Sequence, residues 1–405
     1  MGRVKQAWIE AEERGYTLPD KGKYVCASHF EDIYLQKYIN ENSIKEKCSY
    51  CGKRTNVIDL RDFIEYVCSE LTSHYNNPDN EGLYLSGSFY DNDDEEIPGF
   101  KRVGCYIAPS YVENYESTKE MLSDLDLWTD DDNLNSDIED CFLRDEWIQE
   151  NALCMTECQE LSLSWELFAQ MVKYEQRFTF FKKTEFIRES PSGDNGLFDI
   201  LTELGTKMTS LGLIKEIEVN SILYRCRFID DTEIVDSFDK ITSAPNDKAK
   251  QSRMSPAGVS MFYGNFDKST AIAESSPDGK TIDGRYVVGK FRLIKPLKVL
   301  DLTSLPQYSF WMSGDKEGIA FLRSFNNEIT KSIIRDDRIH IEYVPSQVFT
   351  EYLRYIYKYD KENIDGIIYK SSLKDSKDNN IVLFYNQCKS SEILELVTIE
   401  HNKSD

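Results

Sequence analysis

Residues 253–274 carry three side-chain types that could bind and polarise a small molecule. Arg253 offers a permanent cation, Tyr263 a phenol and Glu274 a carboxylate. A guanidinium binds anionic oxygens through a planar fork of N–H donors, and a carboxylate stabilises positive charge that develops beside it. Taken alone, this stretch predicts only that a cation, a phenol and a carboxylate meet around a turn.

A turn, a strand and a helix are expected to position these three side chains. The Ser-Pro-Ala-Gly sequence at 255–258 predicts the turn, and the mostly apolar run 259–263 predicts a short buried strand. Asp267 is the expected N-cap of the helix that follows. That helix carries Glu274 within its first two turns.

A second set of residues has the spacing of a metal site. Two residues separate Cys26 from His29, two separate Cys48 from Cys51, and eighteen lie between the pairs. Such spacing lets a tight turn direct both side chains at one ion, and sulfur and imidazole ligands suit tetrahedral Zn²⁺. Because four protein ligands leave no position for water, we expect a structural zinc knuckle over about residues 24–53. The alternative is that Cys26 and His29 are ordinary core residues.

The composition excludes several classes of partner. The chain of 405 residues has 48 Lys and Arg against 71 Asp and Glu, which gives a formal net charge of −23. This charge repels nucleic acid and anionic membranes at long range, although a local cationic pocket can still hold a small anion. No apolar run approaches the ~18 residues that span a bilayer, and the polar opening shows no secretory signal. We therefore expect a cytoplasmic protein that binds neither a membrane nor a polymeric nucleic acid.

Changes in composition and in the pattern of apolar residues divide the chain into regions. Residues 1–180 are acidic, with apolar positions at helical spacing, and predict a mainly helical domain held by the zinc knuckle. A stretch rich in Ser, Pro and Gly marks 181–204 as a linker with a connecting helix. Strand-like and helix-like segments alternate irregularly over 205–392, which predicts an α+β domain with mixed or antiparallel sheets. Residues 393–405 are expected to form a tail.

Periodicity predicts individual elements within these regions. Residues 57–75, 112–128 and 138–178 have apolar positions typical of helices. Residues 339–344 alternate in the manner of a strand, and a helix is expected over 345–357.

Four segments of the C-terminal region resemble the RES domain family, in the order that the family has them. The segments are 223–227, 253–274, 343–353 and 365–372, the last followed by a strand at 380–384. Together they span about residues 217–388. Each segment alone is weakly specific, whereas four in order are specific.

The resemblance implies a fold like that of ADP-ribosyltransferases and a reaction on NAD⁺. Members of the family break the nicotinamide–ribose bond by hydrolysis or phosphorolysis, or transfer ADP-ribose to a protein. The positions characteristic of the family fall here on Arg225, Arg253, Tyr263, Glu274 and Ser371, with Tyr224 before the first arginine and Arg227 as an alternative to it. Two departures, Lys370 where proline is common and a polar insert at 230–250, put substrate access in doubt more than chemistry.

The residue types suit cleavage of that bond. The reaction passes through an oxocarbenium-like ribose, and the cationic nicotinamide of NAD⁺ leaves without a strong general acid. By resemblance, Glu274 supplies the carboxylate beside the ribose, and Arg225 and Arg253 hold the diphosphate. Tyr263 stacks on nicotinamide or lines its pocket, and Ser371 binds the ribose or orients Glu274.

The N-terminal region resembles the HEPN-like domain that precedes some RES domains. Catalytic HEPN ribonucleases need an arginine followed four to six residues later by a histidine on a helix, and residues 1–180 lack this pattern. Arg335 and His340 fit the spacing but lie in the C-terminal region, so we interpret the match as coincidence. The N-terminal domain is expected to restrain the enzyme or to make it oligomerise.

These observations predict an NAD⁺-consuming enzyme that is the toxic effector of a toxin–antitoxin or anti-phage defence system. The expected partners are NAD⁺, an antitoxin protein and further copies of the chain. The first alternative is an ADP-ribosyltransferase that modifies a macromolecule with the same residues. The second is a non-catalytic zinc-ribbon interaction protein, in which loss of Cys51 abolishes function and loss of Glu274 does not.

Overall fold

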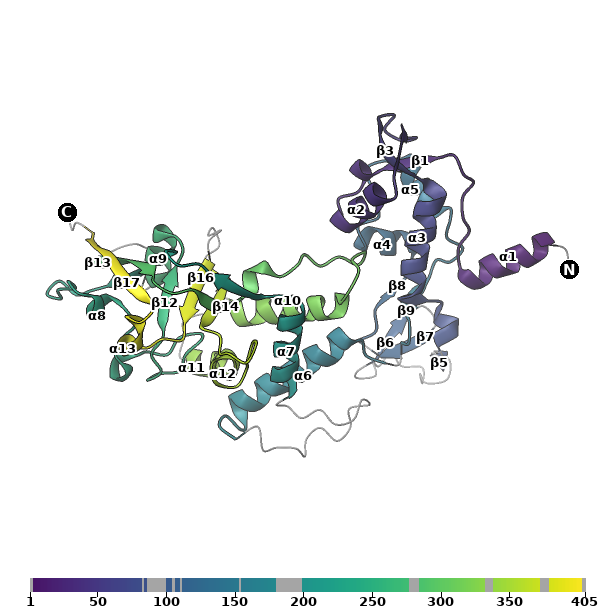
Figure 1. Ribbon diagram of the computed structural model, residues 1–405. Coiled ribbons are helices and arrows are strands. Elements are labelled where there is room, and N and C mark those ends of the chain that lie inside the picture. The colour runs from purple at the N-terminus through teal and green to yellow at the C-terminus, as the bar shows by residue number, and fades with distance from the viewer. Residues whose placement is uncertain are drawn as a thin grey trace. The chain divides into compact units, whose positions relative to one another are not determined.

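The protein is described from a computed structural model. The structure describes residues 3–81, 84–85, 100–103, 106–109, 111–152, 154–179, 199–276, 284–331, 338–371 and 379–402. Two compact units make up the chain, the first comprising Met1–Gln159 with Gln307–Glu317 and the second Glu160–Pro306 with Gly318–Asp405. Each unit combines helices with sheets, so the fold is α+β as predicted (Figure 1).

Three small antiparallel sheets and several helices form the first unit. The sheets are β1–β3–β2 (Tyr24–Cys26, Arg54–Asp59, Ile44–Lys47), β4–β9–β8 (Tyr75–Asn76, Trp147–Gln149, Asn114–Tyr115) and β5–β7–β6 (Tyr84–Leu85, Tyr106–Pro109, Phe100–Val103). The helices are α1 (Arg3–Arg14), α2 (Ile33–Glu41), α3 (Leu60–Thr72), α4 (Thr118–Asp124) and α5 (Asp132–Glu139). The sheets were not predicted, because strands of two to six residues are too short for periodicity to reveal.

The helix expected over 57–75 begins later than predicted. Its first three residues belong to β3, and α3 starts at Leu60 because the Asp59 side chain accepts a hydrogen bond from the Arg61 backbone N–H at 3.0 Å. The buried face of α3 then follows the predicted helical spacing. Its members are Leu60, Phe63, Ile64, Val67, Cys68 and Leu71.

The two long helices expected after residue 111 are shorter than predicted. Within 112–128 the structure has β8 and then α4, and within 138–178 it has the end of α5, β9 and then α6 (Glu157–Tyr174). Trp147 in β9 is completely buried, so its apolar character reflects a strand in the core rather than a helix face.

The segment 307–317 lies far along the chain but belongs to the first unit. Phe310 and Trp311 are buried in its hydrophobic core. The Trp311 indole N–H donates to the Leu125 carbonyl at 2.6 Å, and the Tyr66 hydroxyl donates to the Trp311 carbonyl at 3.1 Å. The sequence predicted no such insertion, since nothing in a local pattern says which core an aromatic residue joins.

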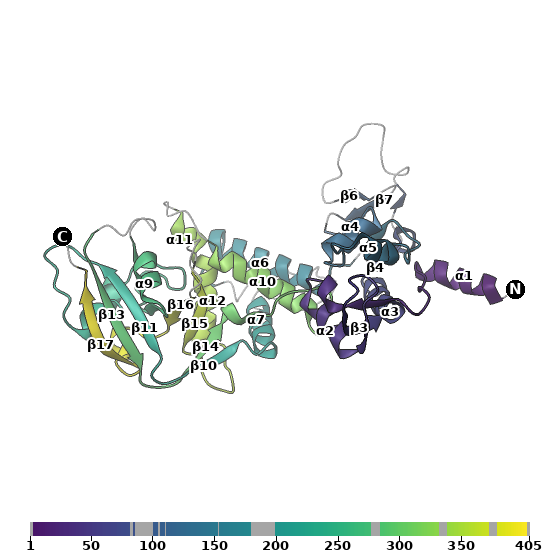
Figure 2. The same cartoon turned by 90° about the horizontal axis from the view of Figure 1, so that it is seen from above.

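An eight-stranded mixed sheet forms the centre of the second unit, in the order β10–β14–β15–β16–β12–β11–β13–β17 (Figure 2). The strands are β10 (Ile214–Ile217), β11 (Ile222–Phe228), β12 (Phe262–Asn265), β13 (Tyr286–Leu293), β14 (Leu297–Asp301), β15 (Gly366–Lys370), β16 (Asn379–Leu383) and β17 (Leu394–His401). β14 and β15 run parallel, and the other neighbours are antiparallel. β11 and β12 share one residue pair, Tyr224 and Asn265, so little backbone pairing joins them.

Residues 393–405, expected as a tail, include β17, which pairs with β13 at the edge of the sheet. Leu394 is buried, but most residues of β17 are half-buried or exposed. Such an edge strand carries little apolar signal in its sequence.

The two faces of the sheet around β11 and β12 carry different layers. Leu223, Phe262 and Phe291 point into the main core of the unit, which α8 (Phe238–Ile241) helps to cover. On the opposite face, Cys226 packs with Ala271 of α9 (Lys268–Ser275). Helix α9 therefore covers one face of β11 (Figure 2).

Helices complete the second unit. They are α6 from Glu160 onward, α7 (Asp199–Ser210), α10 (Lys316–Thr330) from Gly318 onward, α11 (Ile339–Glu342), α12 (Val344–Tyr355) and α13 (Gln387–Ser390). Buried aromatic rings join three of them: Trp165 of α6 meets Phe325 of α10 at 4.8 Å, and Phe325 meets Phe349 of α12 at 5.0 Å between ring centres.

Some of these helices differ from the sequence predictions. Helix α10 was not predicted from the sequence. The strand expected at 339–344 is wrong, because the structure has α11 there; an alternation over so few residues fits either conformation. Arg335, which formed the coincidental pattern with His340, lies outside the described residues.

Among the helices that the structure describes, none combines the length and apolar character needed to cross a lipid bilayer.

Candidate functional site

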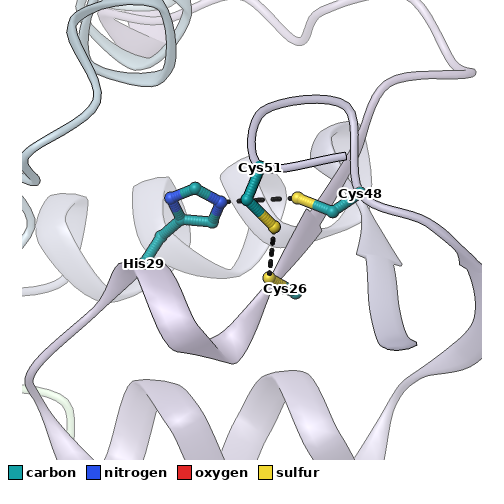
Figure 3. A group of neighbouring side chains, drawn as sticks. All are labelled: Cys26, His29, Cys48 and Cys51. Carbon is teal, nitrogen blue, oxygen red and sulfur yellow. Dashed lines mark hydrogen bonds between the residues drawn. The ribbon is translucent and has the colours of Figure 1, made fainter. Parts of the chain in front are cut away.

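Cys26, His29, Cys48 and Cys51, here called the Cys/His cluster, face one another in the first unit (Figure 3). Their ligand atoms all lie within 4.8 Å of one another. The sulfurs of Cys26 and Cys51 are 3.6 Å apart, and Nε2 of His29 is 3.4 Å from the Cys48 sulfur.

Three short elements deliver these ligands. Cys26 ends β1, His29 ends the single-turn helix η1 (Ala27–His29), and the turn between β2 and β3 carries the other two cysteines. Gly52 closes that turn with φ +70°, a backbone conformation that favours glycine. The close return of the chain follows from this conformation.

The cluster fits a tetrahedral zinc ion. Zn–S bonds of about 2.3 Å place two ligand sulfurs roughly 3.8 Å apart, close to the spacing of Cys26 and Cys51. Burial lowers the pKa of His29, which favours the neutral imidazole that binds metal. Burial raises the pKa of Cys26 to about 11, so a metal must displace a proton to bind there. The cluster could hold a metal ion, and four protein ligands fit a structural site.

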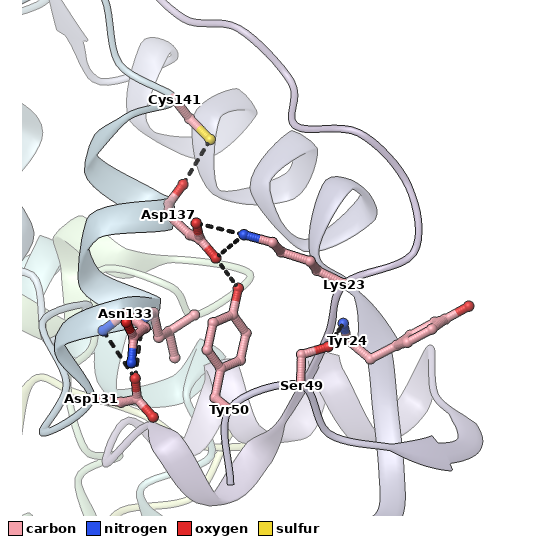
Figure 4. A network of polar contacts seen from close by, with 9 residues as sticks. Lys23, Tyr24, Ser49, Tyr50, Asp131, Asn133, Asp137 and Cys141 are labelled. Carbon is pink, nitrogen blue, oxygen red and sulfur yellow. Dashed lines mark hydrogen bonds and ion pairs between the residues drawn. The ribbon is translucent and has the colours of Figure 1, made fainter. Parts of the chain in front are cut away.

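Polar contacts tie the turn that carries Cys48 and Cys51 to helix α5 (Figure 4). The Tyr50 hydroxyl donates to the Asp137 carboxylate at 2.7 Å, and the Lys23 ammonium donates to the same carboxylate at 2.6 Å. Burial, followed by the bond to Asp137, raises the pKa of the Tyr50 phenol. Ser49 accepts a hydrogen bond from the backbone N–H of Tyr24 at 2.9 Å. These contacts fix the turn on the strand and on the helix that flank it.

Glu274 occupies the centre of a second polar arrangement, in the second unit. Helix α9 begins as predicted, with the Asp267 side chain accepting from the Thr270 N–H at 2.9 Å. The Ser371 hydroxyl donates to Oε1 of Glu274, and the Asn380 amide donates to the same oxygen at 2.9 Å. We call Glu274, Ser371 and Asn380 the carboxylate site.

Both donors of the carboxylate site reach one oxygen. No residue in the described part of the chain donates to the other oxygen, Oε2 of Glu274. The Asn265 amide in turn donates to the Asn380 side-chain oxygen, which fixes the orientation of that amide. The carboxylate is therefore held from one side and retains acceptor capacity on the other.

Two tyrosines lie next to the carboxylate site. Tyr263 on β12 shares a hydrogen bond of 2.9 Å with the Ser255 hydroxyl, and burial raises its pKa to about 12. Tyr369 on β15 is buried, which raises its pKa; Tyr263 and Glu274 raise it further, and Arg253 lowers it. Tyr263, Glu274 and Arg253 therefore lie close enough to Tyr369 to affect its ionisation.

Asn265, Asn380 and Tyr369 were missed by the sequence analysis. Asn380 pairs with Tyr369 on one side and with Asn265 on the other, so the three follow one another across neighbouring strands. A polar residue at an inward position of an apolar strand was the available signal. Ser372, considered beside Ser371 from the sequence, lies outside the described residues.

Arg225 supports the strand that carries Tyr263. Its Nη1 donates to the Tyr263 carbonyl at 2.8 Å, and its guanidinium lies 5.8 Å from the ring centre of Phe262. Its Nε is buried without a partner among the described residues. Burial and the nearby charge of Arg227 lower the pKa of Arg225 to about 10. This arginine lies where β11 and β12 share only one residue pair.

The structure places the remaining binding candidates of β11 outside the carboxylate site. Arg227 donates to the Lys240 carbonyl and to the Glu233 carboxylate, each at 2.7 Å. Tyr224 packs beside Cys226 on the face that α9 covers. No contact among the described residues joins Arg227 to Glu274.

Arg253 lines a pocket of about 240 Å³ in the second unit. Its Nη1 donates to the Ile329 carbonyl at 2.7 Å, and its guanidinium lies 5.3 Å from the ring centre of Tyr343. The Ser346 hydroxyl donates to the Arg253 carbonyl at 2.6 Å. The pocket is lined by Trp165, Lys173, Arg253, Glu328, Ile329, Lys331, Glu342, Tyr343, Pro345 and Ser346.

Comparison with protein families finds two matches along the chain. Residues 222–400 match the family model of the RES domain, and residues 41–186 match that of HEPN/RES N-terminal domain 1. No curated protein matches the chain. A RES domain is consistent with an enzyme that acts on NAD⁺. The chain is a RES-domain protein with an N-terminal domain of the HEPN/RES type.

Proposed function

We propose that this protein cleaves the nicotinamide–ribose bond of NAD⁺, with Glu274 as the carboxylate that acts on the ribose. The observation that carries the proposal is the one-sided support of Glu274. Ser371 and Asn380 both donate to Oε1, and no described residue donates to Oε2. The match of residues 222–400 to the RES domain supports the same substrate.

The chemistry assigned to Glu274 follows from the charge that develops in the reaction. When the C1′–N bond breaks, its electron pair returns to the nicotinamide ring, which leaves neutral, and the ribose becomes oxocarbenium-like. A carboxylate already oriented by Ser371 and Asn380 stabilises that cation without reorganisation. Its Oε2 faces the ribose, as a partner for the cation or for a hydroxyl. Water, which loses a proton to the solvent, or phosphate then forms a bond to C1′ and completes hydrolysis or phosphorolysis.

Binding of the dinucleotide is assigned to Arg253. Only Nη1 of this guanidinium has an acceptor among the described residues, the Ile329 carbonyl. Its remaining N–H donors suit a phosphate oxygen pair. In this proposal Tyr263 lines the nicotinamide side, and Arg225 positions it through the bond to its carbonyl.

The biological setting completes the proposal. Loss of NAD⁺ stops growth, so the enzyme acts as the toxic effector of a toxin–antitoxin or anti-phage defence system. The Cys/His cluster holds a structural zinc ion in the N-terminal domain and takes no part in the reaction.

The test follows the products of NAD⁺ incubated with the purified full chain. We expect free nicotinamide together with ADP-ribose, or with its phosphorylated form when phosphate is supplied, and loss of both in Glu274→Gln. Glu218→Gln, which changes an exposed carboxylate, is the matched control and keeps activity. Label from NAD⁺ on a macromolecule indicates ADP-ribosyl transfer instead. Intact NAD⁺ with the wild-type chain overturns the proposal.

A further inference from the structure

We propose that helix α6 positions Arg253 for the dinucleotide, through two anchors that act on its two neighbours. This inference rests on the proposed function, because it assigns Arg253 to NAD⁺. It adds Trp165 and Lys173 as positioning residues, and both lie in the part of the chain that matches the HEPN/RES N-terminal domain.

Arg253 is held by two neighbours on different helices. The Ile329 carbonyl of α10 accepts its Nη1 at 2.7 Å. The ring of Tyr343, directly after α11, lies 5.3 Å from its guanidinium carbon. The orientation of the guanidinium therefore depends on where the end of α10 and the start of α12 are placed.

Helix α6 holds both of these places. The indole N–H of Trp165 donates to the carboxylate of Glu328, the residue before Ile329, at 2.9 Å. The ammonium of Lys173 donates to the carboxylate of Glu342, the residue before Tyr343, at 2.8 Å. Each anchor thus lies one residue from a contact of Arg253.

The spacing on α6 suits this role. Trp165 and Lys173 are eight residues apart, which corresponds to about 12 Å along a helix. Both line the pocket that Arg253 lines. One rigid helix therefore spans the two supports and fixes the distance between them.

Trp165 and Lys173 are shielded from solvent, so the loss of either contact is expected to move the residues that it holds. Trp165 is 2% exposed and the Lys173 side chain 16% exposed. Removing one member of a shielded ion pair leaves the other charge poorly compensated, so Glu342 and the adjoining Tyr343 are expected to shift. The carboxylates of Glu328 and Glu342 bind Trp165 and Lys173 of α6. Arg253 has no carboxylate partner among the described residues.

The assignment gives the N-terminal family region a part in substrate binding. All of these residues lie in the second compact unit, although α6 precedes the RES match in the sequence. A RES domain that begins at residue 222 lacks both anchors of Arg253. Anything that displaces α6 is expected to lower affinity for NAD⁺ before it affects the carboxylate site.

Lys173→Met in the full chain tests the assignment. We expect KM for NAD⁺, and the Kd measured by calorimetry in a Glu274→Gln background, to rise about tenfold or more while kcat changes little. Lys173→Arg restores both values, and Trp165→Phe, which keeps an aromatic ring but loses the indole N–H, gives a smaller rise. Lys215→Met, at an exposed lysine of β10, is the control and leaves both values unchanged.

Coupling to Arg253 separates positioning from a general structural role. In an Arg253→Ala background, Lys173→Met should add no further rise in Kd, since the group that it positions is gone. The inference is overturned if the fold-changes in Kd caused by Lys173→Met and by Arg253→Ala multiply in the double variant. It is also overturned if Lys173→Met folds and its Kd is unchanged.

The two proposals fail differently. Nicotinamide release with an unchanged KM in Lys173→Met removes the role of α6 alone. NAD⁺ binding that Lys173→Met weakens, without any cleavage by the wild type, removes the proposed reaction alone. A wild-type chain that neither binds nor cleaves NAD⁺ overturns both.

Discussion

The Cys/His cluster and the carboxylate site differ in whether their polar atoms can still bind a molecule from outside the chain. In the cluster, four ligand atoms converge on one point within 4.8 Å of one another. In the carboxylate site, one oxygen of Glu274 receives both donors and no described residue donates to the other. The first arrangement is closed, and the second leaves an acceptor for a molecule that is not part of the chain.

In the proposed function, this difference is the one between a structural site and a reactive site. A ligand set that satisfies an ion completely gives stability to the fold and excludes water from the ion. A charged group that the protein holds from one side can still bind a substrate or stabilise a transition state with its other side. Changes in the cluster are therefore expected to affect unfolding, and changes in the carboxylate site to affect turnover.

Metal removal should give the largest effect. Binding of structural zinc contributes on the order of 10 kcal/mol to the folding of small metal domains. We expect Cys51→Ser, or a strong chelator, to release one zinc per chain and to unfold the β2–β3 turn. Elemental analysis and hydrogen exchange of residues 44–59 measure both changes.

Cys388→Ser, at an exposed cysteine of α13 outside the cluster, is the matched control and should keep metal content and exchange unchanged. Full protection of the β2–β3 turn after complete metal loss contradicts a structural role for the cluster.

Glu274→Gln should give the next largest effect, on turnover alone. A glutamine carbonyl can still accept from Ser371 and Asn380, so the melting temperature should stay near that of the wild type. Loss of the negative charge should lower kcat by roughly 10³-fold, the order expected for an electrostatic group at the reacting centre. Nicotinamide release and thermal unfolding, measured on the same samples, check both parts.

The zinc-ribbon interaction hypothesis predicts the reverse outcome. In that case Glu274→Gln keeps the biological function, whereas Cys51→Ser abolishes it. Toxicity on expression, compared between these two variants, decides which unit carries the function.

Parts of both sites were predictable because they depend on local order. The Cys-x2-His and Cys-x2-Cys spacings place two ligands on each turn, and the structure brings the pairs together. Asp267 is the predicted N-cap of α9, and the resemblance to the RES family indicated Glu274 and Ser371, which the structure joins by a hydrogen bond. Their roles in catalysis stay predictions.

The unpredicted parts depend on contacts between distant segments. Asn380 reaches Glu274 because β16 lies beside β12 and β15, a register that no local pattern specifies. The contact of Trp165 with Phe325 of α10 was not predicted either, since helical spacing does not say against which core a helix packs. A fragment limited to the α+β domain expected from the sequence, 205–392, lacks the edge strand β17. It also carries Phe310 and Trp311 of the insertion 307–317 without their core. Such a fragment is a poor test of whether the N-terminal domain restrains the enzyme.

Asn380→Ala should give an intermediate effect on the carboxylate site. Glu274 keeps its bond to Ser371 but loses a donor to Oε1, and we expect kcat to fall about 10- to 100-fold, as for loss of one hydrogen bond to a charged group. The fall should appear in kcat rather than in KM, because Asn380 acts on Glu274 and not on the diphosphate. Steady-state kinetics of NAD⁺ cleavage measure both constants.

Asn379→Ala is the matched control for this variant. Asn379 is the adjacent residue on β16 and therefore points to the opposite face of the sheet. Among the described residues, its side chain makes one long contact of 3.4 Å, to Thr303. Equal losses of kcat in both variants indicate damage to the strand rather than loss of support for Glu274.

Tyr50→Phe should give the smallest effect, and only on stability. The Tyr50 hydroxyl ties the β2–β3 turn to Asp137 of α5, and loss of one such bond to a carboxylate costs about 1–3 kcal/mol. Lys23 remains on Asp137, so the carboxylate keeps a partner and the cost should lie near the lower value.

Tyr24→Phe is the control, since no described residue is bonded to the Tyr24 hydroxyl. We expect Tyr50→Phe to lower the free energy of unfolding of the metal-loaded protein and to leave kcat and KM unchanged. A fall in kcat at full metal content contradicts the separation of the two sites, because it requires the turn to act on the carboxylate site.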